Sequence, residues 1–377
     1  MPRSVGRRAG RGLRAAERSA TGVPLLNGKV VDLTGPGLTD RWGVTCADLG
    51  ACVVAPNGKL VSVFGDTFSG RKVGEGDWRS PVVLIGTGDA DHEIVYERAG
   101  GEDPDYARQL WHYIHDDAAT GWTRGGISTV IPSDLLRVSD SIYLHAIVNR
   151  GLGTVIWTEI WRSDDSGISW THMGEKAKFD ADLHGGHAQC WSWDFDPDDG
   201  WVYVVATGFQ RDKGIILMRV RPEHIGDHSR YSCWGFTDGR WAWRNQATPI
   251  TPDGEKWGEL TFRRMAQGKW ILGGFLASKY ALGYRVVDSP IANMHTTPLQ
   301  MPVVGSAWDG EDHLNNCVAQ LYGGYVLPGS RFDIKGGIGL VVSQWNTSVG
   351  WPYRAMQFKA LLKDTTKTVE PPDPVNL

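Results

Sequence analysis

Two aspartates, Asp48 and Asp66, are the strongest candidates for chemistry in this sequence. Asp48 lies nine residues before Asn57 and Asp66 nine residues after it, and the Pro-Asn-Gly segment at 56–58 predicts the turn of a hairpin. The two carboxylates are then approximate cross-strand neighbours. Such a pair should not ionise at one pH, so that one carboxyl serves as an acid and the other as a base or nucleophile.

Hydrolysis of a glycosidic bond needs this division of labour between two carboxyl groups. The alternative interpretation is structural. Asp48 would cap a turn, and Asp66 would hold the following Gly-Asp-Thr-Phe loop by accepting backbone N–H bonds.

The chain around this pair consists of short apolar runs separated by Gly, Asn and Asp turns. Its 377 residues include 48 glycines and 18 tryptophans, and a helical apolar period is hard to find. Five successive sets of four short strands can be traced, over residues 45–96, 127–174, 187–236, 258–304 and 315–361. This organisation predicts an all-β, five-bladed β-propeller, with a two-sheet sandwich as the alternative.

One local motif supports the propeller independently. Residues 163–170 fit the pattern S-x-D-x-G-x-[ST]-W of the Asp-box turn, which joins the third and fourth strands of blades in sialidase-like propellers. We expect Asp165 to accept backbone N–H bonds, Gly167 to adopt a positive φ and Trp170 to pack into the blade. The motif is structural and does not identify a reaction.

Propeller geometry also predicts the residues that surround the acidic pair. The innermost strand of each blade begins on the face where the second strand ends, so side chains at both places gather around the axis. Planar polar groups and an aromatic ring there would suit a sugar. The residues selected are Trp42, Arg150, His187, Gln189, Glu259, Asn316 and Arg331. His184 and His187 could also suggest a metal site, but two histidines on a glycine-rich turn are better read as loop residues, and we expect no metal or cofactor.

The two ends of the chain differ from its middle. We expect residues 1–22 to form an arm, 23–362 the propeller and 363–377 a polar tail. The arm has a single acidic residue, Glu17, against six arginines, and is either a solvated tail or a docking segment. The arginines are Arg3, Arg7, Arg8, Arg11, Arg14 and Arg18.

Charge and hydropathy exclude several classes of partner. A net charge of -4 gives no reason to expect nucleic acid as a ligand. The sequence has no apolar segment of a Sec signal peptide and no run long enough to span a membrane, so an extracellular location would require another export route. The five cysteines form no C-x-x-C motif and are expected to be buried thiols.

Several spaced segments of the chain are familiar. The stretches GVTCADLGACVVAPNGKLVSVFGDTF, HGGHAQCWSWDFDPDDGWVYVVATGFQRDKGIILMRV, GELTFRR and VVSQWNTSVGWPYRAMQFKALL resemble the domain of unknown function 4185, placed in glycoside hydrolase family 183. The resemblance covers about residues 25–362. It implies a five-bladed propeller that cleaves the D-arabinan of mycobacterial arabinogalactan and lipoarabinomannan in an endo manner, with Asp48 and Asp66 matching the family's paired aspartates.

Similar domains occur in tail proteins of phages that infect mycobacteria. Together with the arginine-rich arm, this resemblance suggests a virion tail component that docks on other tail proteins. Two further functions stay open. One is a non-catalytic propeller that recognises cell-surface polysaccharide. The other is a sialidase-like exo-enzyme, which is disfavoured because no set of three arginines that would grip a substrate carboxylate can be identified.

Overall fold

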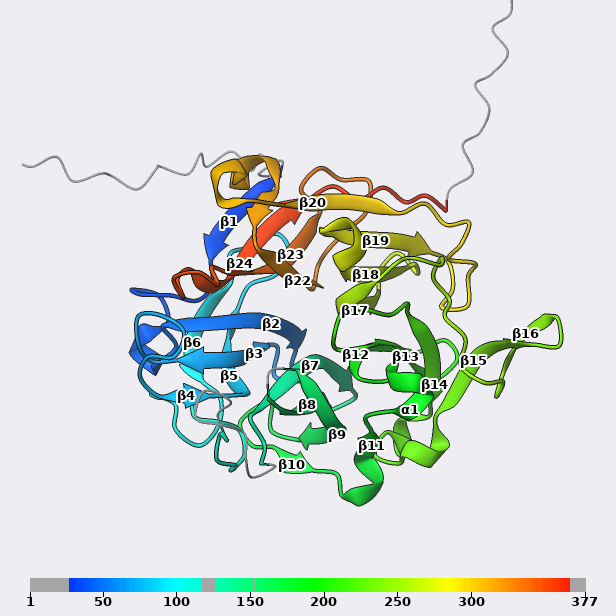
Figure 1. Cartoon of the computed structure of the whole chain (residues 1–377), viewed down its shortest axis with the longest axis horizontal. Helices are drawn as coiled ribbons and strands as arrows, with labels where there is room; N and C mark the ends of the chain where they lie inside the picture. The colour runs from blue at the N-terminus through cyan, green and yellow to red at the C-terminus, as the bar shows by residue number, and fades with distance from the viewer. Residues whose placement is uncertain (1–26, 117–125, 152, 367–377) are drawn as a thin grey trace, which may run out of the picture.

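A computed structural model describes residues 27–116, 126–151 and 153–366, which form five largely antiparallel sheets arranged around a central axis (Figure 1). The predicted arm and the end of the predicted tail lie outside the described residues. The fold is the predicted five-bladed β-propeller.

The first three blades follow one another along the chain, each starting at the axis. Blade one contains β2 (Cys46–Val54), β3 (Leu60–Phe68), β5 (Val82–Thr87) and β6 (Val95–Ala99), with β4 (Trp78–Arg79) beside β3. Blade two contains β7 (Thr129–Val138), β8 (Ser141–Arg150), β9 (Thr154–Ser163) and β10 (Thr171–His172), with β11 (Lys178–Asp180) also beside β9. Blade three contains β12 (Cys190–Asp196), β13 (Trp201–Thr207), β14 (Ile216–Val220), β15 (Ser232–Thr237) and β16 (Arg240–Trp243).

Blade four contains β17 (Trp257–Arg264), β18 (Trp270–Leu276), β19 (Ala281–Val287), β20 (Gln300–Ser306) and β21 (Cys317–Ala319). Among the described residues, helical structure is confined to short turns. These are α1 (Leu183–Gly186) and the 3-10 turns η1 (Asp40–Trp42), η3 (Glu175–Ala177), η4 (Pro222–His224), η5 (His228–Arg230), η6 (Ala277–Lys279), η7 (Trp308–Gly310) and η8 (His313–Asn315). In the part of the chain that the structure describes, no helix is long and apolar enough to cross a membrane.

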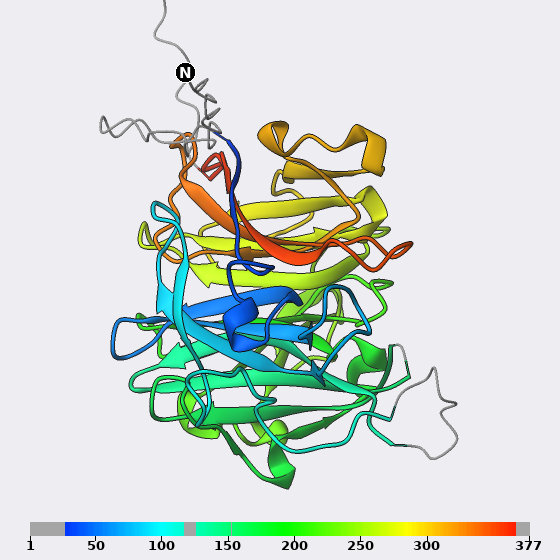
Figure 2. The same cartoon turned by 90° about the vertical axis from the view of Figure 1, so that its left-hand side faces the viewer.

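Blade five joins the two ends of the described chain. From the axis outward it contains β22 (Leu321–Val326), β23 (Ile338–Trp345), β24 (Tyr353–Ala360) and β1 (Gly28–Asp32). β1 runs antiparallel along β24, as the side view shows (Figure 2). This pairing closes the ring of blades, because the first strand of the chain completes the last sheet.

The observed strand order differs from the prediction in blade five. The run 315–322 was expected to be the inner strand of blade five, but β21 pairs in parallel with β20 at the outer edge of blade four. The inner strand of blade five begins only at Leu321.

Aromatic side chains hold neighbouring blades together. Trp191 of blade three packs edge-on against Phe179 of blade two, with ring centroids 4.8 Å apart. Tyr203 of blade three packs in the same way against Trp270 of blade four, at 5.7 Å. Trp191 and Trp270 are almost completely buried. Such large buried rings contribute much of the apolar area that stabilises the contacts between blades.

The Asp box has the predicted geometry. Asp165 Oδ1 accepts the backbone N–H of Ile168 at 3.1 Å and of Ser169 at 2.8 Å. Gly167 has a φ of 91°, and the half-buried Trp170 packs against the main hydrophobic core. The motif lies between β9 and β10, where the sequence placed it.

Candidate active site

Asp48 lies at an irregularity in β2, where the chain departs from regular pairing with β3. Pairing is regular at Ala47 opposite Thr67 and then shifts on both sides of Leu49. Leu49 has a φ of 63°, a conformation that a bulky residue rarely adopts. Its N–H donates to Ser343 Oγ of blade five at 2.9 Å, which holds the bulge in place. The bulge thus fixes the position from which the Asp48 side chain projects.

Gly65 on the facing strand makes room for this carboxyl group. A Cβ at position 65 would lie 2.5 Å from Asp48 Oδ1, which is closer than real contacts allow. The space that a side chain of residue 65 would fill is therefore occupied by the Asp48 carboxyl.

The Asp48 carboxyl lies close to the hydroxyls of Tyr322 and Tyr353. The Tyr322 hydroxyl donates to Oδ2 at 2.8 Å, while Oδ1 is buried and has no hydrogen-bond partner among the described residues. Burial, followed by the charge of Asp66, raises the pKa of Asp48 to about 7. The hydroxyls of Tyr322 and Tyr353 act in the opposite direction. Near neutral pH this group can hold a proton and release it.

Asp66 has a more polar environment. Its Oδ1 accepts hydrogen bonds from Trp78 Nε1 at 2.8 Å and from Thr129 Oγ1 at 2.5 Å. The pKa of Asp66 is raised overall, because the effect of burial exceeds that of these two donors and of nearby His115, which lower it. Two hydrogen bonds to one oxygen stabilise the carboxylate form. The two carboxyls of one hairpin therefore sit in different surroundings.

Trp78 is itself held in place by an aromatic neighbour. The ring of His115 stacks on the Trp78 ring at 4.0 Å, and the two His115 nitrogens lie 2.6 Å from Ser128 O and 2.8 Å from Gln109 Oε1. The indole N–H that contacts Asp66 is consequently oriented by packing as well as by its own hydrogen bond.

A third carboxylate, Glu259 of β17, lies near the pair. Its charge raises the pKa of Asp48. Glu259 Oε1 pairs with Arg211 Nη2 at 2.6 Å, and its Oε2 is buried without a hydrogen-bond partner among the described residues. The Arg211 guanidinium lies 5.2 Å from the centre of the Tyr322 ring, whose hydroxyl contacts Asp48. Glu259, Arg211 and Tyr322 thus form one wall of the site.

Arg211 and Tyr322 were not selected from the sequence. Arg211 lies in the connection between β13 and β14, whereas the selection favoured strand ends. Tyr322 belongs to β22, which is the inner strand of blade five, whereas residues 315–322 were expected to form that strand. A correct strand assignment would have found Tyr322, but no local pattern singles out Arg211.

Three other predicted residues lie on blades two and three, at the ends that face the site. Arg150 is exposed at the end of β8. Gln189 is already engaged, because its Nε2 donates to Ala181 O at 2.7 Å and its Oε1 accepts the Phe209 N–H at 3.0 Å. His187 lies 2.9 Å through Nδ1 from the carbonyl of His184.

The structure places Trp42, Asn316 and Arg331 differently from the prediction. Trp42 is only 4% exposed and lies in the core, with the Arg41 guanidinium 3.8 Å above its ring, so that little of the ring can face a sugar. Asn316 is buried at the rim, where its Nδ2 donates to Lys359 O at 3.2 Å.

Arg331 follows the inner strand of blade five and not the second strand. It therefore lies on the face of the propeller opposite the acidic pair, where it pairs with Asp91 at 2.7 Å. Asn316 and Arg331 were both selected because residues 315–322 were expected to form the inner strand of blade five. The inner strand is β22 instead, so both residues lie away from the positions predicted for them.

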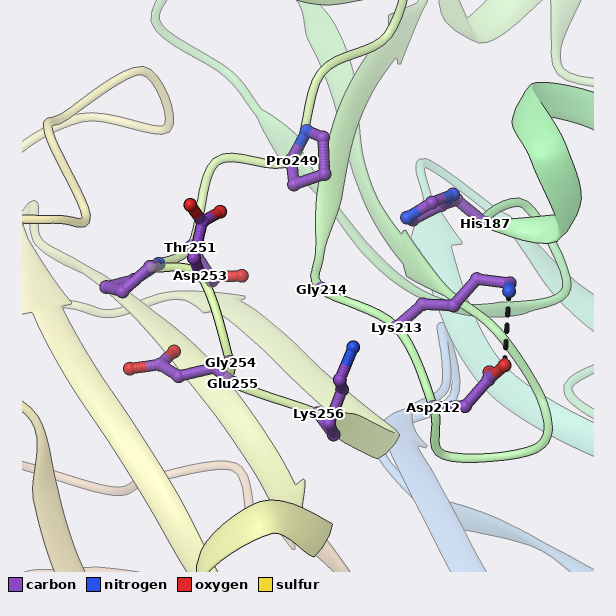
Figure 3. Close-up of a pocket in the computed structure, with 11 residues that line it drawn as sticks. His187, Asp212, Lys213, Gly214, Pro249, Thr251, Asp253, Gly254, Glu255 and Lys256 are labelled. Carbon is purple, nitrogen blue, oxygen red and sulfur yellow. Dashed lines mark hydrogen bonds and ion pairs between the residues drawn. The ribbon is translucent and has the colours of Figure 1, made fainter.

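A cleft of about 300 Å³ opens beside His187, between blades three and four (Figure 3). Its walls are the segment 212–214, which follows Arg211, and the segment 249–256. The His187 ring and the Lys256 amine point toward the space between these walls, while Lys213 pairs with Asp212 at 3.1 Å. Arg211, which pairs with Glu259, directly precedes the segment 212–214. The same stretch of chain therefore contributes to this cleft and to the wall that contains Glu259.

The two histidines of the glycine-rich turn contact different partners. The His184 ring lies 3.2 Å through Nε2 from Cys233 Sγ, whereas His187 contacts the backbone carbonyl of His184. Across residues 27–116, 126–151 and 153–366, no group of three or more His, Cys, Asp or Glu side chains is arranged to hold a metal ion.

Comparisons of the fold find several solved propellers. A putative hydrolase of Bacteroides ovatus ATCC 8483 matches with a TM-score of 0.56 at 13% identity, over 85% of this chain and 87% of that one. A GH43_1 enzyme of Xanthomonas citri matches with a TM-score of 0.51 at 12% identity, over 90% and 94%. At this level of identity the likeness concerns the fold alone.

Comparisons of the amino-acid sequence identify relatives of higher identity. A protein of Mycolicibacterium smegmatis, named "uncharacterized 35.9 kDa protein in asd 3'region", is 29% identical over 336 residues, which cover 85% of this chain and 93% of that protein. Notoamide biosynthesis cluster protein J of Aspergillus sp. strain MF297-2 is 30% identical over 321 residues, 82% of each chain. The domain of unknown function DUF4185 matches residues 34–359. The chain therefore belongs to the DUF4185 family.

Proposed function

We propose that this protein is a glycoside hydrolase in which Asp48 and Asp66 are the two working carboxyl groups. The observation that carries the proposal is the environment of the pair: one hairpin holds both groups, and burial beside Asp66 raises the pKa of Asp48 to about 7. A carboxyl group that is partly protonated near neutral pH, beside a hydrogen-bonded carboxylate, matches the requirements of glycoside hydrolysis.

The contacts support different roles for the two groups. Asp48 is the general acid, because its raised pKa lets it hold, near neutral pH, the proton that the departing sugar oxygen needs. Asp66 accepts two hydrogen bonds that favour its ionised form, which suits the base or nucleophile. Burial and the charge of Asp66 favour the protonated form of Asp48, and the charge of Glu259, which is itself held by Arg211, adds to this effect.

The proposed substrate is the D-arabinan of mycobacterial-type cell walls, cleaved within the chain. The resemblance of the segments around Asp48 and Asp66 to glycoside hydrolase family 183 supports this choice. A virion or extracellular location is part of the same proposal, since such a polymer lies outside the cell. The arginine-rich arm that would dock on a phage tail lies outside the described residues.

The decisive experiment incubates the purified full-length chain with mycobacterial arabinogalactan and measures the size of the products. We expect arabino-oligosaccharides from the wild type. Asp48→Asn and Asp66→Asn should each lower the rate by about 10²-fold or more, since proton transfer by a positioned group contributes that much. Asp309→Asn, which changes an exposed aspartate on η7, serves as the control and should keep full activity.

The roles can be separated with an aryl arabino-oligosaccharide whose phenol leaves without protonation. If Asp48 is the acid, Asp48→Asn regains much of its activity on this substrate and Asp66→Asn does not. The alternative function is a non-catalytic propeller that recognises the polysaccharide. Binding of arabinan by the wild type with no change in its chain length would contradict hydrolysis and favour that alternative.

A further inference from the structure

A second cleft, of about 610 Å³, lies on the outer part of blade three. It is bordered by the end of β14, the turns η4 and η5, the start of β15 and the residues that follow β16. Trp201 and Arg221 lie at the end of the blade opposite Cys190 and Thr207, which face the candidate active site. The residues lining this arginine cleft are Trp201, Arg219, Arg221, His224, Ser229, Arg230, Tyr231, Ser232, Cys233, Arg244 and Asn245.

The lining contains four arginines and no carboxylate. None of the four forms an ion pair with any of the residues that the structure describes. The whole chain has a net charge of -4, so this concentration of unneutralised positive charge does not follow from a basic composition. Placing four guanidinium groups around one cleft costs electrostatic energy, which an anionic ligand would recover.

Two of the arginines are held rigidly by tryptophans. The Arg219 guanidinium lies between Trp201 and Trp243, at 4.1 and 4.0 Å from the ring centres. The Arg221 guanidinium lies 3.9 Å from the Trp201 ring, and its Nη1 donates to the carbonyls of Asp199 and Gly200. Stacking fixes the plane of a guanidinium and leaves its edge available for hydrogen bonds.

Two buried polar atoms in the lining have no partner. Arg219 Nε and Ser232 Oγ are both buried, and neither has a hydrogen-bond partner among the described residues. A buried donor without a partner is costly unless a ligand or water satisfies it. Both atoms belong to side chains that line the cleft, so that the polar groups of the lining are not fully satisfied by the protein itself.

The other two arginines complete the cleft from its exposed side. Arg230 Nη2 lies 3.2 Å from His224 Nε2. Arg244 has a φ of 73°, which an arginine rarely adopts, and its backbone N–H donates to Cys233 O at 2.8 Å. Strained backbone of this kind is more common at ligand sites than elsewhere.

We propose that the arginine cleft binds a phosphate monoester. A planar guanidinium matches the oxygens of a phosphoryl group in a two-pronged hydrogen bond, and four guanidiniums offer more donors than the two oxygens of a carboxylate can accept. The cleft is larger than a lone ion requires, and its volume falls in the range that encloses an organic ligand. A phosphorylated sugar and inorganic phosphate share the chemistry that the arginines recognise.

The test measures binding calorimetrically with the full-length chain at constant ionic strength. The probes are glucose 6-phosphate and inorganic phosphate, with glucose and acetate as controls. We expect both phosphates to bind and neither control to do so. Tighter binding of glucose 6-phosphate identifies the phosphorylated saccharide as the ligand, and equal binding identifies the free anion. Absence of binding by both phosphates, or equal binding of acetate, would overturn the proposal.

Substitution of lining arginines tests whether phosphate binds in the arginine cleft. Arg230→Gln and Arg244→Gln should each weaken phosphate binding about tenfold or more, the effect of losing a hydrogen bond between charged groups. Arg240→Gln is the matched control, because this exposed arginine belongs to the same β15–β16 hairpin but does not line the cleft. Equal weakening in all three variants would indicate a general charge effect and contradict a site. Because the cleft lies away from Asp48, cleavage of arabinan should be unchanged in these variants, so failure here is independent of the hydrolase proposal.

Discussion

The Tyr322 hydroxyl donates a 2.8 Å hydrogen bond to Asp48 Oδ2, joining two residues that lie 274 positions apart in the sequence. Tyr322 is in the inner strand of blade five and Asp48 in that of blade one. These blades become neighbours only when β1 closes the ring. The chemistry proposed for Asp48 therefore depends on the closure of the propeller.

Removal of this hydrogen bond should shift the pH dependence of activity. The bond lowers the pKa of Asp48, so Tyr322→Phe should raise that pKa. If Asp48 must be protonated to act, the decline of kcat/KM at alkaline pH moves to higher pH. The measurement is a pH profile of arabinan cleavage. Tyr203→Phe is the control, because it removes a hydroxyl that bonds to Asp199 in blade three.

Replacement of Glu259 should have the opposite effect. Its negative charge raises the pKa of Asp48, so Glu259→Gln should lower that pKa and move the alkaline decline to lower pH. The unpaired Arg211 would add to the shift, since a nearby positive charge favours the carboxylate.

Asp288→Asn provides the comparison for this variant, because it breaks the pair with Lys269 in blade four, outside the walls of the site. A pH profile of Glu259→Gln that shifts in the same direction as that of Tyr322→Phe would contradict the electrostatic account of both residues.

The sequence was sufficient to predict the ring of blades and the hairpin that carries the acidic pair. Strand period, turn residues and the Asp box are local signals. The symmetric spacing around Asn57 agrees with the observed pairing of Ala47 with Thr67. What the spacing does not reveal is the bulge at Leu49, since its hydrogen-bond partner Ser343 belongs to another blade.

The displacement in blade five has a physical cause at two positions. Gln320 adopts a φ of 46° and ends β21, although the apolar residues on both sides suggest one continuous strand. The Gly323–Gly324 pair suggests a turn, but it forms a bulge within β22. Glycine permits either conformation, so that the type of residue does not distinguish them.

Addition of one methyl group at Gly65 should impair catalysis more than folding. The Cβ of Gly65→Ala would meet Asp48 Oδ1 at 2.5 Å and displace the carboxyl. We expect a loss in kcat of about tenfold to a hundredfold, the usual effect of a misplaced reacting group. Gly310→Ala is the control, since its nearest neighbour would be Ser306 Cβ at 3.6 Å. Wild-type activity of Gly65→Ala would show that the position of Asp48 is not critical.

The raised pKa of Asp48 also has a consequence for stability. In the unfolded chain this group titrates near its ordinary value of 3.8, whereas in the fold it titrates near 7. Between these values the folded state binds more protons than the unfolded one, so the contribution of Asp48 to stability declines as the pH rises and is lowest above pH 7. Asp48→Asn removes this penalty, and at pH 8 it should be more stable than the wild type by roughly 2 kcal/mol, allowing for partial solvent screening. The two proteins should differ little below about pH 3, where Asp48 is protonated in both states. Urea unfolding at both pH values measures the difference, and a variant that is less stable than the wild type at pH 8 would show that Asp48 is held in its charged form.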